Sequence, residues 1–354
     1  MRRLASWAAP LLVGVVAFVA CRLAMMPGLG FWDTAELQVV APVMGTAHPT
    51  GFPTYVLLGW LANLVLAPFG EAAFRMNLFA GLCIAAAAAV TVDLVRTLTR
   101  STALGVMAGL GLALTAIVWK NGTQAEAHAL HLVLIAILLR LLVAWEQDER
   151  DRTLIAAAAV YGLAAGNHSL TLLLAPPIVL YVLAVDREVL RRPRFLVACL
   201  GTAVATLALV YLELPLRAGP FRAPIVYGRP ETWDGFWYIA LAEQFRGSVV
   251  GPFEDLPAKA ADLIARTVDA FGPLAALVPL AFVVTAIRRP RYAILTGTTV
   301  ALTCFFAASY INAMIDRYYI VPVLMAWTWL AVLAEAIARA AGDVVAGERR
   351  PHRV

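Results

Sequence analysis

The chain has 354 residues, of which 62% are hydrophobic and only 14% are charged, and its formal net charge is +5. Soluble domains carry roughly 45–50% apolar and about 25% charged residues, so this composition excludes an ordinary soluble protein. The apolar residues form long runs, and a helix needs ~20 such residues to cross the hydrocarbon layer. The sequence therefore predicts an all-α, polytopic membrane protein.

The basic residues are scattered in short clusters between the apolar runs, which argues against a nucleic-acid partner and is typical of topology signals. Ten runs are predicted to span the membrane: 5–27, 77–96, 102–119, 128–144, 153–167, 168–185, 195–213, 267–287, 292–309 and 318–340. Whether the run 52–69 also spans the membrane is ambiguous from its hydrophobicity, and the positions of the basic clusters decide the question. If 52–69 does not span, most basic clusters fall on the cytoplasmic side; if it spans, every later cluster lies outside. We therefore expect 52–69 to be an interfacial helix, with both termini inside.

These spans form one predicted domain over residues 1–345, followed by a short cytoplasmic tail, 346–354. It carries two sizeable outer loops, 28–74 and 214–266, and the second is too short for a soluble domain of ordinary size. The expected localisation is a bacterial inner or plasma membrane, with the functional site on the extracytoplasmic side.

The first outer loop groups Asp33, Glu36 and His48. Asp33 and Glu36 are three residues apart, hence on one helical face, and two carboxylates in a partly dry pocket can leave one as a competent base. Alternatively, Asp33 caps a helix that begins at Thr34. Two prolines and a glycine fix a turn after His48, which would hold its ring for an anionic or hydroxylated ligand or simply leave it exposed at a helix entry.

The predicted topology brings further polar side chains to the same face. Ionisable residues in such positions are costly, so their default interpretation is functional. The planar guanidinium group of arginine binds phosphate well, although each arginine here could instead extend its side chain to lipid headgroups. His128 and His131 share a helical face and could bind a metal or simply pack. The substrate-binding candidates are His48, Arg75, Glu126, His168, Arg217, Trp233, Arg317 and Tyr318.

The sequence resembles the GT-C superfamily of membrane glycosyltransferases, and most closely a bacterial family of formerly unknown function with an animal protein O-mannosyltransferase among its members. The similar segments, in chain order, are 33–37, 45–55, 68–70, 75–78, 166–168, 211–217 with Trp233, and, more loosely, 316–319. The pattern in the first loop is the most specific of them.

The resemblance implies transfer of a monosaccharide from a polyprenyl-phosphate donor to a hydroxyl of a protein or glycan. Asp33 or Glu36 inherits the role of catalytic base, and the sequence does not separate them. The hydroxyl would attack the anomeric carbon opposite the phosphate, with inversion, while arginine and histidine side chains stabilise the leaving phosphate. A divalent metal could assist, although the first loop has no D-x-D. The family often has a soluble C-terminal region, and we expect its role here to be absent or supplied by another protein.

A transporter or flippase for a lipid-linked or small anionic solute is the competing interpretation. Transporters place polar residues near the middle of the membrane on broken helices and often contain repeats. Here the polar residues gather on one face and no repeat is visible, which favours the enzyme. A non-catalytic scaffold would leave the grouping of carboxylates and histidine unexplained.

Overall fold

The computed structural model describes the backbone of residues 2–348 and the side chains of residues 7–342. In that part the chain is helical, with two isolated β-bridges, Thr46 with Val226 and Val249 with Tyr310. The predicted all-α class is confirmed. Of the predicted tail, 346–354, the part from residue 349 onward lies outside the described residues. The α-helices are α1 Arg2–Leu23, α2 Trp32–Val40, α3 Pro53–Val65, α4 Ala72–Thr99, α5 Thr102–Leu114, α6 Ala116–Gly122, α7 Ala127–Asp148, α8 Asp151–Asn167, α9 Ala175–Val185, α10 Pro193–Tyr211, α11 Glu213–Ala218, α12 Trp233–Ala240, α13 Leu256–Phe271, α14 Val278–Arg288, α15 Pro290–Ala308 and α16 Ile320–Glu348.

Several of these helices have the length and composition of membrane spans. In the described residues six segments qualify: Ala72–Thr99, Ala127–Asp148, Pro193–Ala218, Leu256–Arg288, Pro290–Ala308 and Ile315–Gly342. Helices α5 and α6 meet at Thr115 with a bend of 70° and together would make a seventh. Helix occupies each of the ten predicted runs, but α8 and α9 have only 17 and 11 residues, so the ten-span count stays a prediction.

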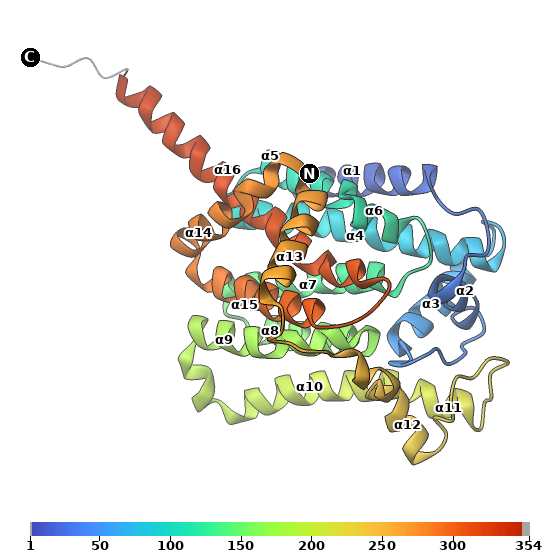
Figure 1. The fold of residues 1–354 in the computed structure, drawn as a ribbon. Coiled ribbons are helices and arrows are strands. Elements are labelled where there is room, and N and C mark those ends of the chain that lie inside the picture. Colours follow the sequence, from blue (N-terminus) through green and yellow to red (C-terminus); the bar gives the residue numbers. More distant parts are fainter. Residues whose placement is uncertain (1, 349–354) are drawn as a thin grey trace, which may run out of the picture.

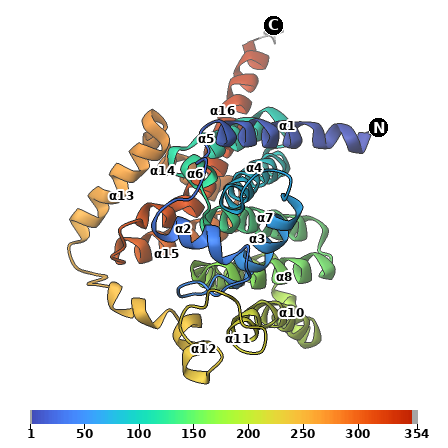
Figure 2. The same ribbon diagram turned by 90° about the vertical axis from the view of Figure 1, so that its right-hand side faces the viewer.

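The long helices pack as a layered bundle. Helices α1, α4, α7, α8 and α10 lie side by side in that order, each in contact with the next (Figure 1). The short helices α2, α3, α11 and α12 gather at one end of the bundle, which faces the viewer in Figure 2. The segment 214–266, expected to be a loop, contains α12 and the first part of α13. One end of the bundle is therefore covered by irregular chain and short helices.

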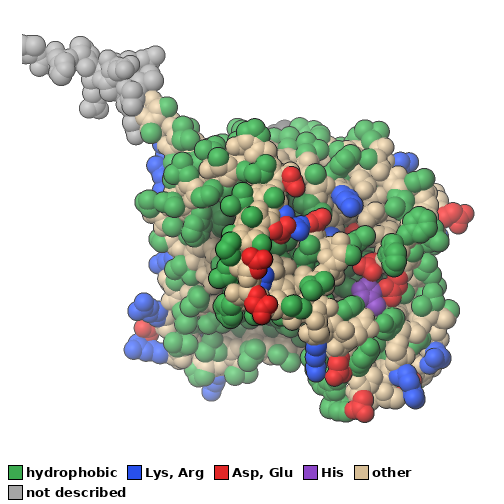
Figure 3. Space-filling model, in the orientation of Figure 1, with side chains coloured by type: hydrophobic (Ala, Val, Ile, Leu, Met, Phe, Trp, Pro, Cys, Tyr) green, Lys and Arg blue, Asp and Glu red, His purple; other side chains and the backbone are tan. Residues whose placement is uncertain are grey.

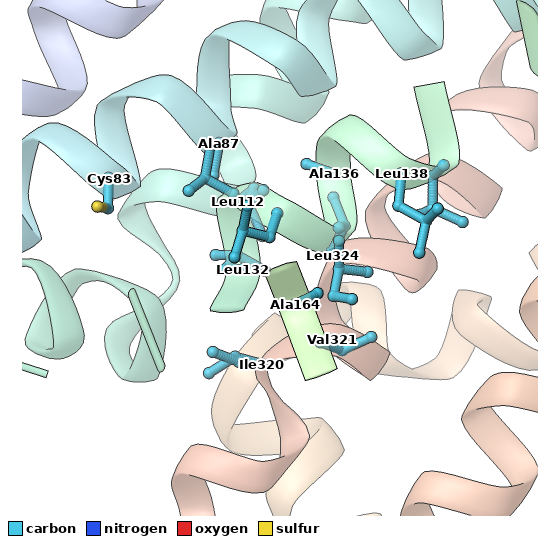
Figure 4. Close-up of a cluster of buried hydrophobic side chains, with 14 of the residues drawn as sticks. Cys83, Ala87, Leu112, Leu132, Ala136, Leu138, Ala164, Ile320, Val321 and Leu324 are labelled. Carbon is cyan, nitrogen blue, oxygen red and sulfur yellow. The ribbon is translucent and has the colours of Figure 1, made fainter. Parts of the chain in front are cut away.

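The core lies where α4, α5, α7, α8 and α16 meet (Figure 4). Leu132 and Leu324 are fully buried there, and small residues such as Ala87 let the backbones approach closely. At Gly109 of α5 an added Cβ would lie only 2.8 Å from the carbonyl oxygen of Ala88 in α4. Because lipid tails are as apolar as leucine, close packing of this kind holds membrane helices together.

The first loop is tied to the bundle by two buried amides. The Gln38 side chain accepts from the amide of Gly30 at 2.7 Å and donates to Asn77 Oδ1 at 2.8 Å. Asn77 also donates to the carbonyl of Met26 at 2.9 Å and accepts from the amide of Ala125 at 2.8 Å. These bonds fix α2 against α4 and against the segment that enters α7.

Replacing Asn77 by Ala should therefore destabilise the protein and loosen the first loop. Several buried partners lose their hydrogen bonds together, each at a cost of about 1–3 kcal/mol. We expect a lower unfolding temperature in detergent and faster amide exchange over residues 26–38. The matched control is Asn121→Ala, because Asn121 donates only to Ile117, one turn back in its own helix. Equal unfolding temperatures for the two variants would contradict the role assigned to Asn77.

Candidate active site

A cavity of about 970 Å³ opens at the end of the bundle that carries α2 and α3. Its wall is built by the first loop with α2, the start of α7, the turn at 168–169, and the stretches 242–248 and 310–318. Figure 3 shows histidine and acidic side chains together in a hollow of a largely hydrophobic surface. The volume is in the range of small-molecule sites.

Helix α2 presents two carboxylates to this cavity. The helix begins at Trp32, which has a φ of +55°, so Asp33 lies in its first turn, and no side chain caps its N-terminus. The alternative that Asp33 serves as a helix cap is therefore wrong. A negative charge in the first turn nevertheless interacts favourably with the helix dipole.

Arg317 joins two acidic residues from distant parts of the chain. Its Nη2 donates to Asp33 Oδ2 at 2.8 Å, and its Nη1 donates to Glu126 Oε1 at 2.7 Å. Glu126 is almost completely buried. Burial raises the pKa of Glu126 above its ordinary value, although the adjacent Arg317 partly offsets this effect. The ion pairs bring α2, the start of α7 and the 3₁₀ turn Ile315–Tyr319 before α16 to one point.

Glu36 holds His48 with both of its carboxylate oxygens. Oε1 accepts from the backbone amide of His48 at 2.8 Å, and Oε2 forms a short contact with His48 Nδ1. Burial lowers the pKa of His48, but the hydrogen bond and negative charge of Glu36 outweigh it and leave the pKa above its ordinary value. His48 is therefore a cation over a wider pH range than a free histidine.

The turn that carries His48 is held by the segment after α11. The amide of Thr46 donates to the carbonyl of Ile225 at 3.1 Å, and the amide of Tyr227 donates back to Thr46. Gly51 has a φ of +81°, and an added Cβ there would lie 2.9 Å from the side chain of Leu214. Glycine is needed at this position both for its backbone conformation and for the close approach.

Three histidines and a tyrosine form a compact cluster at the base of the cavity. The rings of His128 and His168 are 4.6 Å apart, and Tyr318 stacks on His128 at 5.6 Å. His168 Nδ1 accepts from the amide of Leu170 at 3.2 Å. His131 contacts Thr171 at 3.4 Å and does not line the cavity. His48, Glu126, His168, Arg317 and Tyr318, all expected from the sequence, thus meet at one cavity.

Three other candidates lie outside the cavity wall. Arg217 donates from Nη2 to the carbonyl of Val43 at 3.0 Å and from Nε to that of Met44 at 2.8 Å, so it clamps the first loop. Arg75 donates to the carbonyl of Asn63 at 3.1 Å and ties α4 to α3. Trp233 is exposed on α12. Their substrate-binding roles stay predictions, and each arginine has a structural partner.

Several residues that shape the site could not be predicted from the sequence. Gln244, Phe245 and Tyr310 line the cavity, yet they lie in segments without a distinctive pattern. The buried amides of Gln38 and Asn77 position α2 without touching the cavity. Asn77 belongs to one of the segments that resemble the GT-C family, and this was the single available signal for it.

The donor set does not suit a metal ion. Among the described residues, no group of three or more His, Cys, Asp or Glu side chains has the geometry to hold one. Glu36 is bonded to His48, and Asp33 is paired with Arg317. We therefore derive no step through a metal.

Comparison with known proteins bears on this arrangement. Residues 33–191 match the family described as Protein O-mannosyl-transferase TMEM260 N-terminal domain. Mouse Protein O-mannosyl-transferase TMEM260 is 31% identical over 242 residues, which is 66% of this chain and 34% of that protein. The resemblance to this family is confirmed. The chain spans about a third of the length of that relative.

Solved structures agree on the fold. ArnT from Cupriavidus metallidurans, bound to undecaprenyl phosphate, superimposes with a TM-score of 0.65 at 18% identity, covering 91% of this chain and 59% of ArnT. The oligosaccharyltransferase AglB from Archaeoglobus fulgidus, in complex with an inhibitory peptide and a dolichol-phosphate, gives a TM-score of 0.53 at 15% identity, covering 98% of this chain and 52% of AglB. The chain therefore shares its fold with ArnT and AglB.

The ion pair between Glu36 and His48 should make stability depend on pH. The pKa of His48 is raised in the folded state above the ordinary value of 6.5. The stabilisation is thus fully present below that value and is lost as the pH rises through the raised pKa. We expect the difference in unfolding temperature between the wild type and Glu36→Gln to shrink as the pH rises from below 6.5 through the raised pKa of His48. A difference that is constant across this range would contradict the linkage.

Proposed function

We propose that the protein is a glycosyltransferase that moves a monosaccharide from a polyprenyl-phosphate carrier to an acceptor hydroxyl, with inversion, at the outer face of the membrane. The observation that carries this proposal is the cavity at one end of an apolar bundle, where Asp33 lies beside the buried Arg317 and the paired Glu36 and His48. Such a site can supply both a base and cationic donors.

Asp33 is the better candidate for the base. Arg317 bonds its Oδ2, and no other described residue bonds its second oxygen, which stays available for a proton. Both oxygens of Glu36 are bonded to His48. The Asp33 side chain is also more exposed than that of Glu36, 42% against 26%. We therefore assign proton transfer to Asp33 and the orientation of His48 to Glu36.

The reaction follows from these positions. Asp33 takes the proton of the acceptor hydroxyl as its oxygen bonds to the anomeric carbon, and the bond from that carbon to the phosphate oxygen breaks. The polyprenyl phosphate leaves with the bonding electrons. His48, whose Nε2 has no partner among the described residues, donates to the phosphate as charge develops there. A lipid phosphate leaving group requires no nucleotide site.

The comparisons support the choice of substrates. ArnT was solved with undecaprenyl phosphate and AglB with dolichol-phosphate and a peptide, and the mouse relative is named a protein O-mannosyltransferase. A mannosyl donor on a polyprenyl phosphate and a protein hydroxyl are accordingly the first pair to test. Transport receives no comparable support, because the polar cavity lies at one end of the bundle.

The proposed orientation has the cavity outside, both termini inside and α3 in the interface. Helix α3 has 13 residues, or about 20 Å of helix, which is shorter than the ~30 Å hydrocarbon core. It lies at the same end as α2 and exposes Leu61, Leu64 and Val65. These features suit a helix that lies in the outer interface and forms part of the support for the site.

Asp33→Asn should lower the rate of mannose transfer from polyprenyl-phosphate mannose to a hydroxyl acceptor in membranes by about 10²–10⁴-fold, because the amide cannot take the proton. Glu36→Gln should reduce transfer less, since it only loosens His48. The control is Asp234→Asn, an exposed carboxylate in the first turn of α12. If Asp33→Asn keeps full transfer while Glu36→Gln loses it, the assignment is reversed; full transfer in both would refute a carboxylate base.

The orientation can be checked with single cysteines in a background without Cys21, Cys83, Cys199 and Cys304. Glu71→Cys, just before α4, should react with a membrane-impermeant maleimide in intact cells, because the proposed topology places it outside. Its side chain makes no cap bond, so the change disturbs little. Glu188→Cys, in an exposed turn predicted to be cytoplasmic, should react only after permeabilisation. The reverse pattern would refute the proposed topology.

A further inference from the structure

Two buried residues at the base of the cavity have polar atoms without protein partners. These atoms are Glu126 Oε2 and both ring nitrogens of His128. The exposed fractions are 1% for Glu126 and 5% for His128, and both residues line the cavity. Buried polar atoms nearly always have hydrogen-bond partners, so a group of three orphans in a cavity wall needs an explanation.

Two of these atoms, one from each residue, lie close together. Glu126 Oε2 and His128 Nδ1 lie 3.4 Å apart without forming a hydrogen bond, so the two atoms are close enough to reach one ligand together. An imidazole can donate and accept, and a carboxyl group offers acceptor positions. Neighbouring hydroxyls of a sugar ring present the complementary combination of donors and acceptors.

The surroundings also suit a sugar. Tyr318 stacks on His128, and the ring of His168 lies 4.6 Å away, which provides a flat apolar surface beside the polar pair. A mostly apolar wall with a few convergent polar groups is the usual form of a small-molecule site.

Arg317 connects this pair to the proposed base. Its guanidinium bonds Glu126 Oε1 on one side and Asp33 Oδ2 on the other. A sugar bound by Glu126 Oε2 and His128 would therefore lie beside the guanidinium that also holds the proposed base. His48 is bonded to Glu36, three residues after Asp33 on α2, and lines the same cavity, where it can meet the phosphate.

We propose that Glu126 and His128 form the subsite that binds the hydroxyls of the transferred sugar and thereby select which sugar the donor carries. The inference rests on the proposed function, since it specifies one part of that substrate. Neither residue moves the reacting proton; they position the sugar ring.

The test compares two lipids that differ only in the sugar, undecaprenyl-phosphate mannose and undecaprenyl phosphate, for binding to the purified full chain. His128→Leu should weaken binding of the mannosyl lipid by about tenfold or more, because hydrogen bonds to the sugar are lost, and change binding of the sugarless lipid less than about twofold. Glu126→Gln should act in the same direction, and His128→Gln should restore part of the affinity. The matched control His131→Leu, a neighbouring buried histidine outside the cavity wall, should leave the ratio of the two affinities unchanged.

Each outcome decides something different. If His128→Leu weakens the binding of both lipids equally, or of neither, the sugar subsite is overturned. Transfer of mannose by the wild type would still uphold the proposed function in that case. A wild-type protein that binds neither lipid and transfers no sugar would overturn the proposed function and this inference with it.

Discussion

The two ion pairs of Arg317 are the constraint on which the rest of the site depends. The guanidinium is buried, and so is one of its two carboxylate partners. Taking such charges out of water costs several kcal/mol each unless they are paired. Asp33 and Glu126 belong to segments that lie 284 and 191 residues before Arg317, so their pairing requires α2, the start of α7 and the turn before α16 to converge. A single arginine therefore closes the base of the cavity.

A second set of interactions then fixes the first loop without charge. Gln38 and Asn77 bond one another and the backbone around them, and Arg217 holds the carbonyls of Val43 and Met44 from the other side. Side chains held in this way keep their geometry without reorganising when substrate arrives, which is the condition for electrostatic catalysis. The first loop has an irregular backbone, but these bonds hold it on either side of Asp33, Glu36 and His48.

The sequence was sufficient for the helices and for much of the site, for identifiable reasons. Long apolar runs directly indicate segments that are buried in lipid or in the protein core. Asp33, Glu36 and His48 lie close together along the chain, so their grouping can be seen in the sequence. Long-range partners are not encoded locally, so nothing near Arg217 indicated that it would bind the carbonyls of Val43 and Met44. The same applies to His128 and His131, which share a helical face although only His128 lines the cavity. The cap alternative for Asp33 failed because α2 begins at Trp32, two residues earlier than Thr34.

The charges around the cavity explain why two neighbouring carboxylates take different roles. Glu36 is paired with a histidine whose pKa it raises, so this pair presents a cationic ring edge in a neutral unit. Asp33 shares its arginine with Glu126, whose own pKa is raised by burial. The arginine therefore bonds one oxygen of Asp33 and leaves the other without a partner among the described residues. In the proposed reaction, an anionic phosphate is therefore favoured beside His48 and disfavoured beside Asp33, and this asymmetry would set the direction from which the sugar is attacked.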